Sequence, residues 1–202
     1  MIATTRGVIV VFSEKGGVGK TTLSVHLALG LHMPTLLDAD PQATASAWLA
    51  RRDPARGGPR VVRVADADDL PPNFERPAIM DLRPARAAGA RRLLDLADHI
   101  LIPIRAAIPD LLTVGATVEI VKASGRPAGF VLMAVEPRTL EAREVEEALA
   151  PHGLPILGQT TRRVSYGRAA LSGETAVEAG DKAAAIELQA LRRSIVAWAN
   201  SD

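Results

Sequence analysis

Short apolar runs alternate along the chain with longer segments in which hydrophobic residues recur at helical spacing. The short runs predict strands at residues 8–12, 35–37, 61–64, 78–80, 100–104, 130–135 and 155–157. The longer segments predict helices at residues 23–31, 43–51, 85–97, 111–121, 140–150 and 183–198. Because strands that alternate with helices pair through crossover connections, the pattern predicts an α/β fold. We expect a mostly parallel twisted sheet flanked by helices on both faces.

The segments between these elements predict surface loops. Residues 53–60 are rich in Pro and Gly, and residues 65–73 are acidic and contain Pro. The stretch between the run at 155–157 and the last helix is irregular and contains several Arg residues. The sequence has no internal repeat and no linker-like segment, so we expect a single domain over residues 1–202, without an N-terminal helix-turn-helix extension.

Composition limits the classes of protein that need consideration. The 202 residues are 48% hydrophobic, which is enough for one packed core, and the absence of cysteine excludes disulfides, Cys-ligated zinc and iron–sulfur clusters. The sequence shows no signal peptide, and no apolar run approaches the ~20 residues that span a bilayer, so we expect a cytoplasmic protein. The net charge of +1 does not indicate a nucleic-acid binder, so any DNA contact needs a local basic cluster.

A glycine-rich loop follows the first predicted strand and precedes the first predicted helix. Gly16, Gly17 and Gly19 permit positive φ and let backbone N–H groups surround a phosphate at a helix N-terminus. Lys20 would neutralise the β and γ phosphates, and the Thr21 hydroxyl would bind Mg²⁺. The chain is therefore predicted to be a P-loop NTPase.

The loop departs from the usual P-loop pattern and carries an additional lysine, Lys15. Its sequence KGGVGKTT resembles the deviant Walker A motif of the ParA/MinD family of ATPases. The resemblance implies that ATP and Mg²⁺ are cofactors and that Lys15 acts catalytically in trans, on the nucleotide of the partner subunit in an ATP-dependent homodimer. The implied nucleotide-binding residues are Lys15, Gly16, Gly17, Val18, Gly19, Lys20, Thr21 and Thr22.

Acidic residues end the next two predicted strands. Asp38 and Asp40 leave the same side of an extended segment, so one site could use both. The segment resembles the D-x-D-P-Q motif of ParA proteins, which implies that Asp40 orients the attacking water and that Asp38 supports the metal site. Asp81 ends an apolar run as a Walker B aspartate does, which implies Mg²⁺ binding through a water. The following Leu-Arg-Pro departs from the family pattern.

The second half of the chain resembles the short plasmid-type, ParF-like ParA proteins over residues 101–122 and 136–178. Asp110 would lie near a helix start. Residues 133–136 lack the Asn with which relatives contact adenine, so the preference for a base is not predicted. The family holds DNA without sequence preference through basic residues of its C-terminal region, which here implies Arg162, Arg163, Arg168, Arg192 and Arg193. These arginines could equally form a solvated face.

The resemblance implies a cytoplasmic, nucleoid-associated partition ATPase. Such a protein dimerises on ATP, binds DNA non-specifically and segregates plasmid, chromosome or other cargo. A ParB-like centromere-binding protein or another cargo adaptor would stimulate its slow ATP hydrolysis. The absence of cysteine argues against the cluster-carrying relatives, while small-molecule ligases and kinases of related architecture stay open.

The alternative function is a membrane-associated positioning ATPase like MinD. Such a protein attaches through a C-terminal amphipathic helix. The tail at residues 187–202 is amphipathic, but Leu188, Leu191 and Ile195 recur at a spacing that favours packing on the domain.

Overall fold

The structure, a computed structural model, describes residues 7–84, 90–136 and 140–201. They form a seven-stranded sheet in the order β3-β2-β4-β1-β5-β6-β7, in which every pair of neighbours is parallel. The strands are β1 (Val8–Val11), β2 (Thr35–Ala39), β3 (Arg60–Arg63), β4 (Ala78–Leu82), β5 (His99–Arg105), β6 (Ala128–Val135) and β7 (Ile156–Thr161). The predicted α/β fold with a parallel sheet is confirmed.

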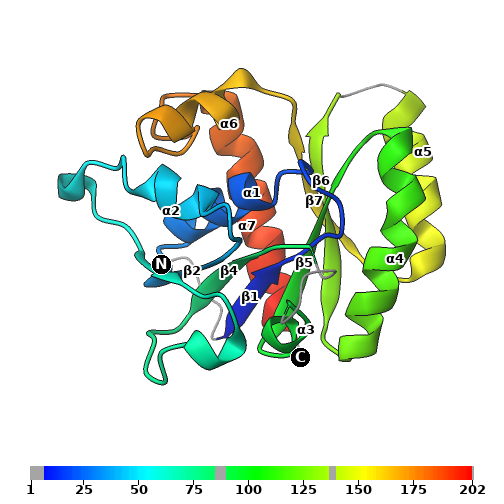
Figure 1. Cartoon of the computed structure of the whole chain (residues 1–202). Helices are drawn as coiled ribbons and strands as arrows, with labels where there is room; N and C mark the ends of the chain where they lie inside the picture. Colours follow the sequence, from blue (N-terminus) through cyan, green and yellow to red (C-terminus); the bar gives the residue numbers. More distant parts are fainter. Residues whose placement is uncertain (1–6, 85–89, 137–139, 202) are drawn as a thin grey trace.

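Helices cover both faces of the sheet (Figure 1). One layer contains α1 (Lys20–Gly30), α2 (Thr44–Leu49), α6 (Val164–Arg168) and α7 (Lys182–Ala199). The opposite layer contains α3 (Ala90–Leu94), α4 (Ile108–Ser124) and α5 (Leu140–Leu149). Short 3₁₀ turns occur at Pro54–Arg56, Ala67–Asp69, Ala150–His152 and Ala169–Leu171.

The alternation of side chains along the strands divides the core between the two layers. In β1, Ile9 and Val11 pack under α1 and α7, whereas Val8 and Val10 pack on the layer of α3, α4 and α5. All four are fully buried, as expected for a central parallel strand. The central strand therefore anchors the loop that follows it from both faces of the sheet.

The apolar stripe of α7 is used within the fold. Leu188, Leu191 and Ile195 are buried against the same core as α1, and Trp48 is buried there as well. The spacing of these residues predicted that the last helix packs on the domain, and the structure confirms it.

Two segments differ from the expectations. The strand predicted at residues 155–157 continues to Thr161, and the segment expected to be irregular contains α6 and a 3₁₀ turn. The polar edge strand, with Gly158 at its centre, carries no long apolar run, so the apolar pattern marks only its first half. The helix predicted over 85–97 is α3 at Ala90–Leu94, and residues 85–89 lie outside the described residues.

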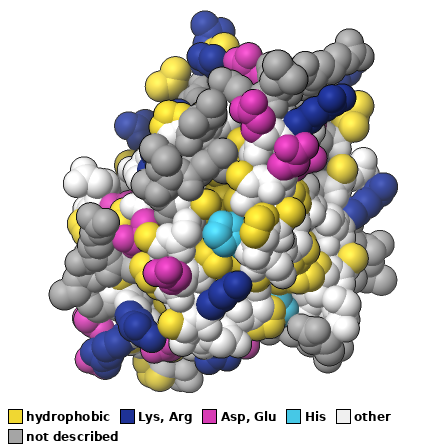
Figure 2. Space-filling view, turned by 90° about the vertical axis from the view of Figure 1, so that its right-hand side faces the viewer, with side chains coloured by type: hydrophobic (Ala, Val, Ile, Leu, Met, Phe, Trp, Pro, Cys, Tyr) yellow, Lys and Arg dark blue, Asp and Glu magenta, His cyan; other side chains and the backbone are white. Residues whose placement is uncertain are grey.

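The opposite layer presents a mixed surface. Figure 2 shows the side of the molecule that carries α4 and α5, where Lys and Arg side chains alternate with Asp and Glu around an apolar centre. Among the described residues visible on this face, the Lys and Arg side chains do not gather into a basic stripe.

His26 connects α1 to the C-terminal part of the chain. Its Nδ1 atom lies 2.8 Å from the Thr22 carbonyl oxygen, and its Nε2 atom accepts the Ala176 N–H at 2.9 Å. Since Nε2 accepts, Nδ1 carries the proton and the ring is neutral. The ring also meets Trp48 edge-on, with 5.6 Å between centroids, and Tyr166 at 5.1 Å. Burial lowers the pKa of His26 to about 4.

This environment predicts an acid-sensitive contribution to stability. His26 takes up a proton near its ordinary pKa of 6.5 when unfolded but only near 4 when folded. Relative to a His26→Gln variant, the wild type should therefore lose about 3 kcal/mol of unfolding free energy as the pH falls from about 6.5 to about 4. Urea unfolding of both proteins across this window measures the difference. Parallel pH profiles for the two proteins would contradict the assignment.

Candidate functional site

The glycine-rich loop joins β1 to α1 at the edge of the sheet where the strands end. Gly17 and Gly19 have φ angles of 73° and 102°. Gly19 also has little room for a side chain, because a Cβ atom on it would lie 3.1 Å from the Met133 Cε atom. Gly16 and Gly17 are exposed, so the backbone of the loop is open to a phosphate group.

Lys20, the first residue of α1, folds back into the loop. The residue is only 8% exposed, and its Nζ atom donates to the carbonyl oxygens of Ser13 at 3.3 Å and Lys15 at 3.0 Å. Burial lowers the pKa of Lys20, and nearby carboxylates, Asp81 foremost, partly oppose the shift. Both hydrogen bonds are to neutral carbonyls, so a bound phosphate would supply the negative charge that this buried cation favours.

Asp81 lies on β4, beside β1, and faces α1. Thr21 and Ser24 donate hydroxyl hydrogen bonds to its two carboxylate oxygens at 2.7 and 3.2 Å. Burial raises the pKa of Asp81 to about 6, and the charge of Asp38, its register partner on β2, adds to this effect. The side chains predicted for the metal site therefore gather at one place.

The Thr21 hydroxyl and the Asp81 carboxylate fit a magnesium ion. Both offer the oxygen ligands that Mg²⁺ prefers, and a buried carboxylate whose pKa is raised by burial would gain from a nearby cation. Within the described ranges, no group of three or more His, Cys, Asp or Glu could hold a metal ion. Phosphate oxygens and waters would therefore complete the ligand set, as is usual for Mg²⁺ in nucleotide sites.

Asp38 and Asp40 differ in what they contact. The Asp38 carboxylate is buried and accepts the Ser46 hydroxyl, the Ser46 N–H at 2.9 Å and the Asp40 N–H at 3.3 Å. Asp40 is half-buried, and it accepts the Gln42 N–H at 2.9 Å. Its charge also acts on Lys20. Asp40 therefore has the exposure that a water-orienting group needs, whereas Asp38 holds the start of α2.

The additional lysine, Lys15, points away from its own loop. Its Nζ atom forms an ion pair with Asp110, a residue of α4 that is 6% exposed and also accepts the Arg105 N–H at 3.2 Å. The Lys15 side chain remains 31% exposed. In this form of the protein, one lysine closes the P-loop and the other is held by a carboxylate next to it.

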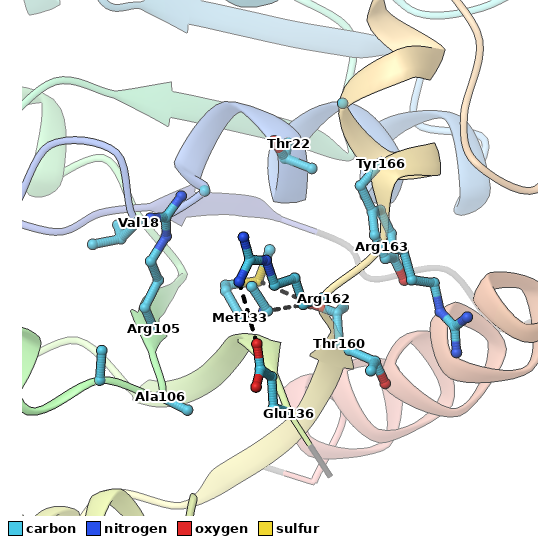
Figure 3. A pocket seen from close by; sticks show the side chains of 15 residues that line it. Val18, Thr22, Arg105, Ala106, Met133, Glu136, Thr160, Arg162, Arg163 and Tyr166 are labelled. Atoms are coloured by element: carbon cyan, nitrogen blue, oxygen red, sulfur yellow. Dashed lines mark hydrogen bonds and ion pairs between the residues drawn. The ribbon is translucent and has the colours of Figure 1, made fainter. Parts of the chain in front are cut away.

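A cavity of about 520 Å³ opens beside the P-loop (Figure 3). Val18, Gly19 and Thr22 form one wall, and Met133, Thr161 and Tyr166 contribute to the opposite side. This volume is in the range of small-molecule sites and suits a nucleoside attached to phosphates on the loop. The glycine-rich motif predicted the phosphate end, and the resemblance placed the relatives' adenine contact at residues 133–136. No motif predicted Thr161 and Tyr166, which come from β7 and α6.

Glu187 of α7 fixes the far wall of the cavity. Its carboxylate accepts the Thr161 N–H and hydroxyl at 3.0 and 2.6 Å, the Arg163 Nε and Nη2 groups at 3.1 and 2.7 Å, and the Tyr166 hydroxyl at 3.1 Å. Burial disfavours its charged form, but these hydrogen bonds outweigh that effect and lower the pKa of Glu187. The last helix is thus tied directly to the cavity.

The five arginines predicted to bind DNA lie in different surroundings. Arg162 and Arg163 line the cavity and pair with Glu136 and Glu187. Arg192 donates to the carbonyl oxygens of Gly30 and Leu188 at 2.7 and 3.0 Å and is partly buried. The other two, Arg168 and Arg193, are exposed, and so is Arg162.

Comparison with known proteins identifies the family. The CobQ/CobB/MinD/ParA nucleotide binding domain matches residues 9–177. The chain belongs to this family of nucleotide-binding proteins, and the predicted membership in the ParA/MinD group is confirmed.

Individual relatives agree with this assignment. The maintenance of carboxysome distribution protein A of Gloeobacter kilaueensis is 34% identical over 183 residues, which cover 82% of each chain. Apo McdA from Cyanothece has the same fold, with a TM-score of 0.77 and 18% identity over 94% of this chain and 99% of that one. A plasmid partition protein from Borrelia burgdorferi, solved with AMPPNP, has a TM-score of 0.75 and 16% identity over 95% of this chain and 99% of that one.

Among the helices that the structure describes, none is long and apolar enough to cross a bilayer.

The fit of Thr21 and Asp81 to a cation leads to a prediction for Mg²⁺. Adding Mg²⁺ should increase the affinity of the wild type for ADP. In Asp81→Asn this increase should be about tenfold smaller, because a charged oxygen ligand is removed. Calorimetric titrations with and without Mg²⁺ measure the gain. Asp95→Asn, an exposed aspartate after α3, is the matched control. An equal gain in Asp81→Asn and the wild type would contradict the metal site.

Proposed function

We propose that this protein is an ATP-driven positioning ATPase. It binds ATP with Mg²⁺, dimerises, holds DNA without sequence preference and distributes a cargo along the nucleoid in the cytoplasm. ATP hydrolysis is slow and releases the dimer, and a cargo adaptor stimulates it. The observation that carries the proposal is the different placement of the two lysines. Lys20 is hydrogen-bonded within its own P-loop, whereas Lys15 is paired with Asp110 outside it.

The position of Lys15 supports a switch that depends on dimerisation. Lys20 is buried where it can neutralise phosphates of the same subunit. Lys15 is partly exposed and paired with Asp110, so it is not needed to shape the loop. If Lys15 leaves Asp110 for the nucleotide of a second subunit, an ion pair within one chain is exchanged for one between chains. Such an exchange lets ATP, through its phosphates, select the dimer.

The site has the parts that slow phosphoryl transfer requires. This reaction depends on positioning and charge neutralisation more than on covalent chemistry. Asp40 would orient the attacking water, and Lys20 with Lys15 of the second subunit would balance the phosphate charge. Since one of these cations comes from the second subunit, a single chain is incomplete and hydrolysis is expected to require the dimer.

The cargo is proposed from the relatives. The Gloeobacter relative is named for carboxysome distribution and is 34% identical, whereas the plasmid partition protein from Borrelia shares only the fold at 16% identity. This difference favours a carboxysome or another cargo with its own adaptor over a plasmid with a ParB-like protein. Plasmid and chromosome cargo are the alternatives. Identifying the adaptor protein that binds this chain would distinguish among the three cargoes.

The membrane-associated alternative receives less support from the fold. Attachment by an amphipathic helix needs an apolar face that can enter the bilayer. In α7, Leu188, Leu191 and Ile195 are instead buried in the core, whereas Ile186 is exposed. ATP-dependent pelleting with anionic liposomes, without retention on DNA, would favour the alternative.

The lysine switch predicts a separation of binding from dimerisation. With a non-hydrolysable ATP analogue and Mg²⁺, the wild type should form dimers retained on DNA. Lys15→Gln should bind nucleotide within about threefold of the wild type but stay monomeric, because the lost charge serves the other subunit. Light scattering measures the dimer, and a retention assay measures its binding to DNA. Lys122→Gln, at the end of α4, is the control. A dimeric Lys15→Gln on DNA would contradict the switch.

The exposed arginines of the C-terminal region predict the DNA contact. Arg168→Glu and Arg193→Glu should each reduce DNA retention of the analogue-bound dimer about tenfold or more at low salt, and raising the salt should weaken wild-type retention steeply. Arg143→Glu makes the same charge change on α5, in the opposite layer. Equal losses in all three variants would indicate a general effect of net charge and contradict a local DNA surface.

A further inference from the structure

Three of the described arginines, Arg105, Arg162 and Arg163, line the cavity beside the P-loop. Two of them are already paired. The Arg162 Nη1 atom lies 3.2 Å from Glu136, as the dashed line in Figure 3 shows, and the Arg163 Nη2 atom lies 2.7 Å from Glu187. The Arg105 guanidinium has neither a hydrogen bond nor an ion pair with any residue in the described part of the chain. Its positive charge is available to a ligand of the cavity.

The backbone of Arg105 is held firmly although its side chain is exposed. Arg105 ends β5, its N–H donates to the buried Asp110 carboxylate at 3.2 Å, and its carbonyl oxygen accepts the Ala107 N–H at 2.8 Å. In the sheet, Arg105 is the register partner of Met133. The side chain of Met133 packs against Gly19 of the P-loop. The base of the Arg105 side chain is therefore fixed one strand away from the residue that touches the loop.

The side chain extends along the phosphate end of the cavity. In Figure 3, Arg105 reaches from the end of β5 toward Val18. Arg162 lies in the middle of the view beside Met133 and Glu136, and Arg163 lies on the side of Tyr166. Val18, Gly19 and Thr22 belong to the loop and the first turn of α1 and line the same cavity. An anion bound to the loop would lie within the cavity that Arg105 also borders.

The chemistry of the site selects the ligand. A guanidinium offers several donors in a planar fork and pairs best with phosphate or carboxylate oxygens. The neighbouring loop favours phosphates through its open backbone and Lys20. We infer that Arg105 is a second cation of the nucleotide site, which binds the phosphate chain of the nucleotide held by its own subunit. This inference rests on the nucleotide site of the proposed function but not on DNA or cargo.

The test compares the affinities of full-length variants for ADP and for pyrophosphate by calorimetry. Arg105→Gln should weaken both ligands by the same factor, about tenfold, because the lost contact is a charge-assisted hydrogen bond to phosphate. Arg105→Lys should recover most of the loss, since it keeps the charge but not the fork. Arg143→Gln makes the same change on α5, outside the residues that line the cavity, and should change either affinity less than twofold. Thermal unfolding without ligand should be the same in all four proteins.

Several results would overturn the inference. Unchanged ADP and pyrophosphate affinities in Arg105→Gln would do so, and so would equal losses in Arg105→Gln and Arg143→Gln. A loss for ADP alone would assign Arg105 to the nucleoside, and normal ADP binding with lost DNA retention would assign it to DNA. A wild type that binds ADP but neither dimerises nor holds DNA would contradict the proposed function and leave the Arg105 comparison standing. A wild type that binds neither ligand would contradict both.

Discussion

Parallel pairing between all neighbouring strands is the constraint on which the site depends. Because the strands run in one direction, their carboxyl ends share one edge, and the residues that follow β1, β2, β4 and β5 meet there. The glycine-rich loop, Asp40, Asp81 and Arg105 come from four separate parts of the chain and converge for this reason. The helices cover the faces and leave this edge as the place where a ligand can enter.

This end of the sheet holds two buried groups of opposite charge, a pair of carboxylates and a lysine. Asp81 and Asp38 are buried side by side on neighbouring strands, and the pKa of Asp81 is raised to about 6 by burial and by this proximity. Lys20 is buried within the P-loop, and its pKa is lowered by burial. The carboxylates act on Lys20, but burial still dominates the pKa shift of both Asp81 and Lys20. A magnesium nucleotide would supply a cation for the carboxylates and phosphates for the lysine.

Much of this arrangement was predictable from the sequence because it depends on local patterns. The positive φ angles of the loop at residues 15–22 fall at Gly17 and Gly19, and Asp81 follows a short apolar run that predicts a buried strand. The cavity wall was not predictable, since Tyr166, Thr161 and Glu187 act together only after α6 and α7 pack on β7. Lys15 and Asp110 are far apart in the sequence, and no local pattern predicts that they pair. The charges of Arg162 and Arg163 suggested DNA, but only packing reveals the carboxylates that they face.

The structure of the protein with a non-hydrolysable ATP analogue and Mg²⁺ tests the central claim most directly. We expect the phosphates on the backbone of the glycine-rich loop and the nucleoside in the cavity next to Tyr166. We also expect a two-fold dimer in which Lys15 has left Asp110 and contacts the phosphates of the partner subunit. A bound analogue with Lys15 still paired to Asp110 in a dimer would contradict the account, as would a nucleotide bound away from the loop.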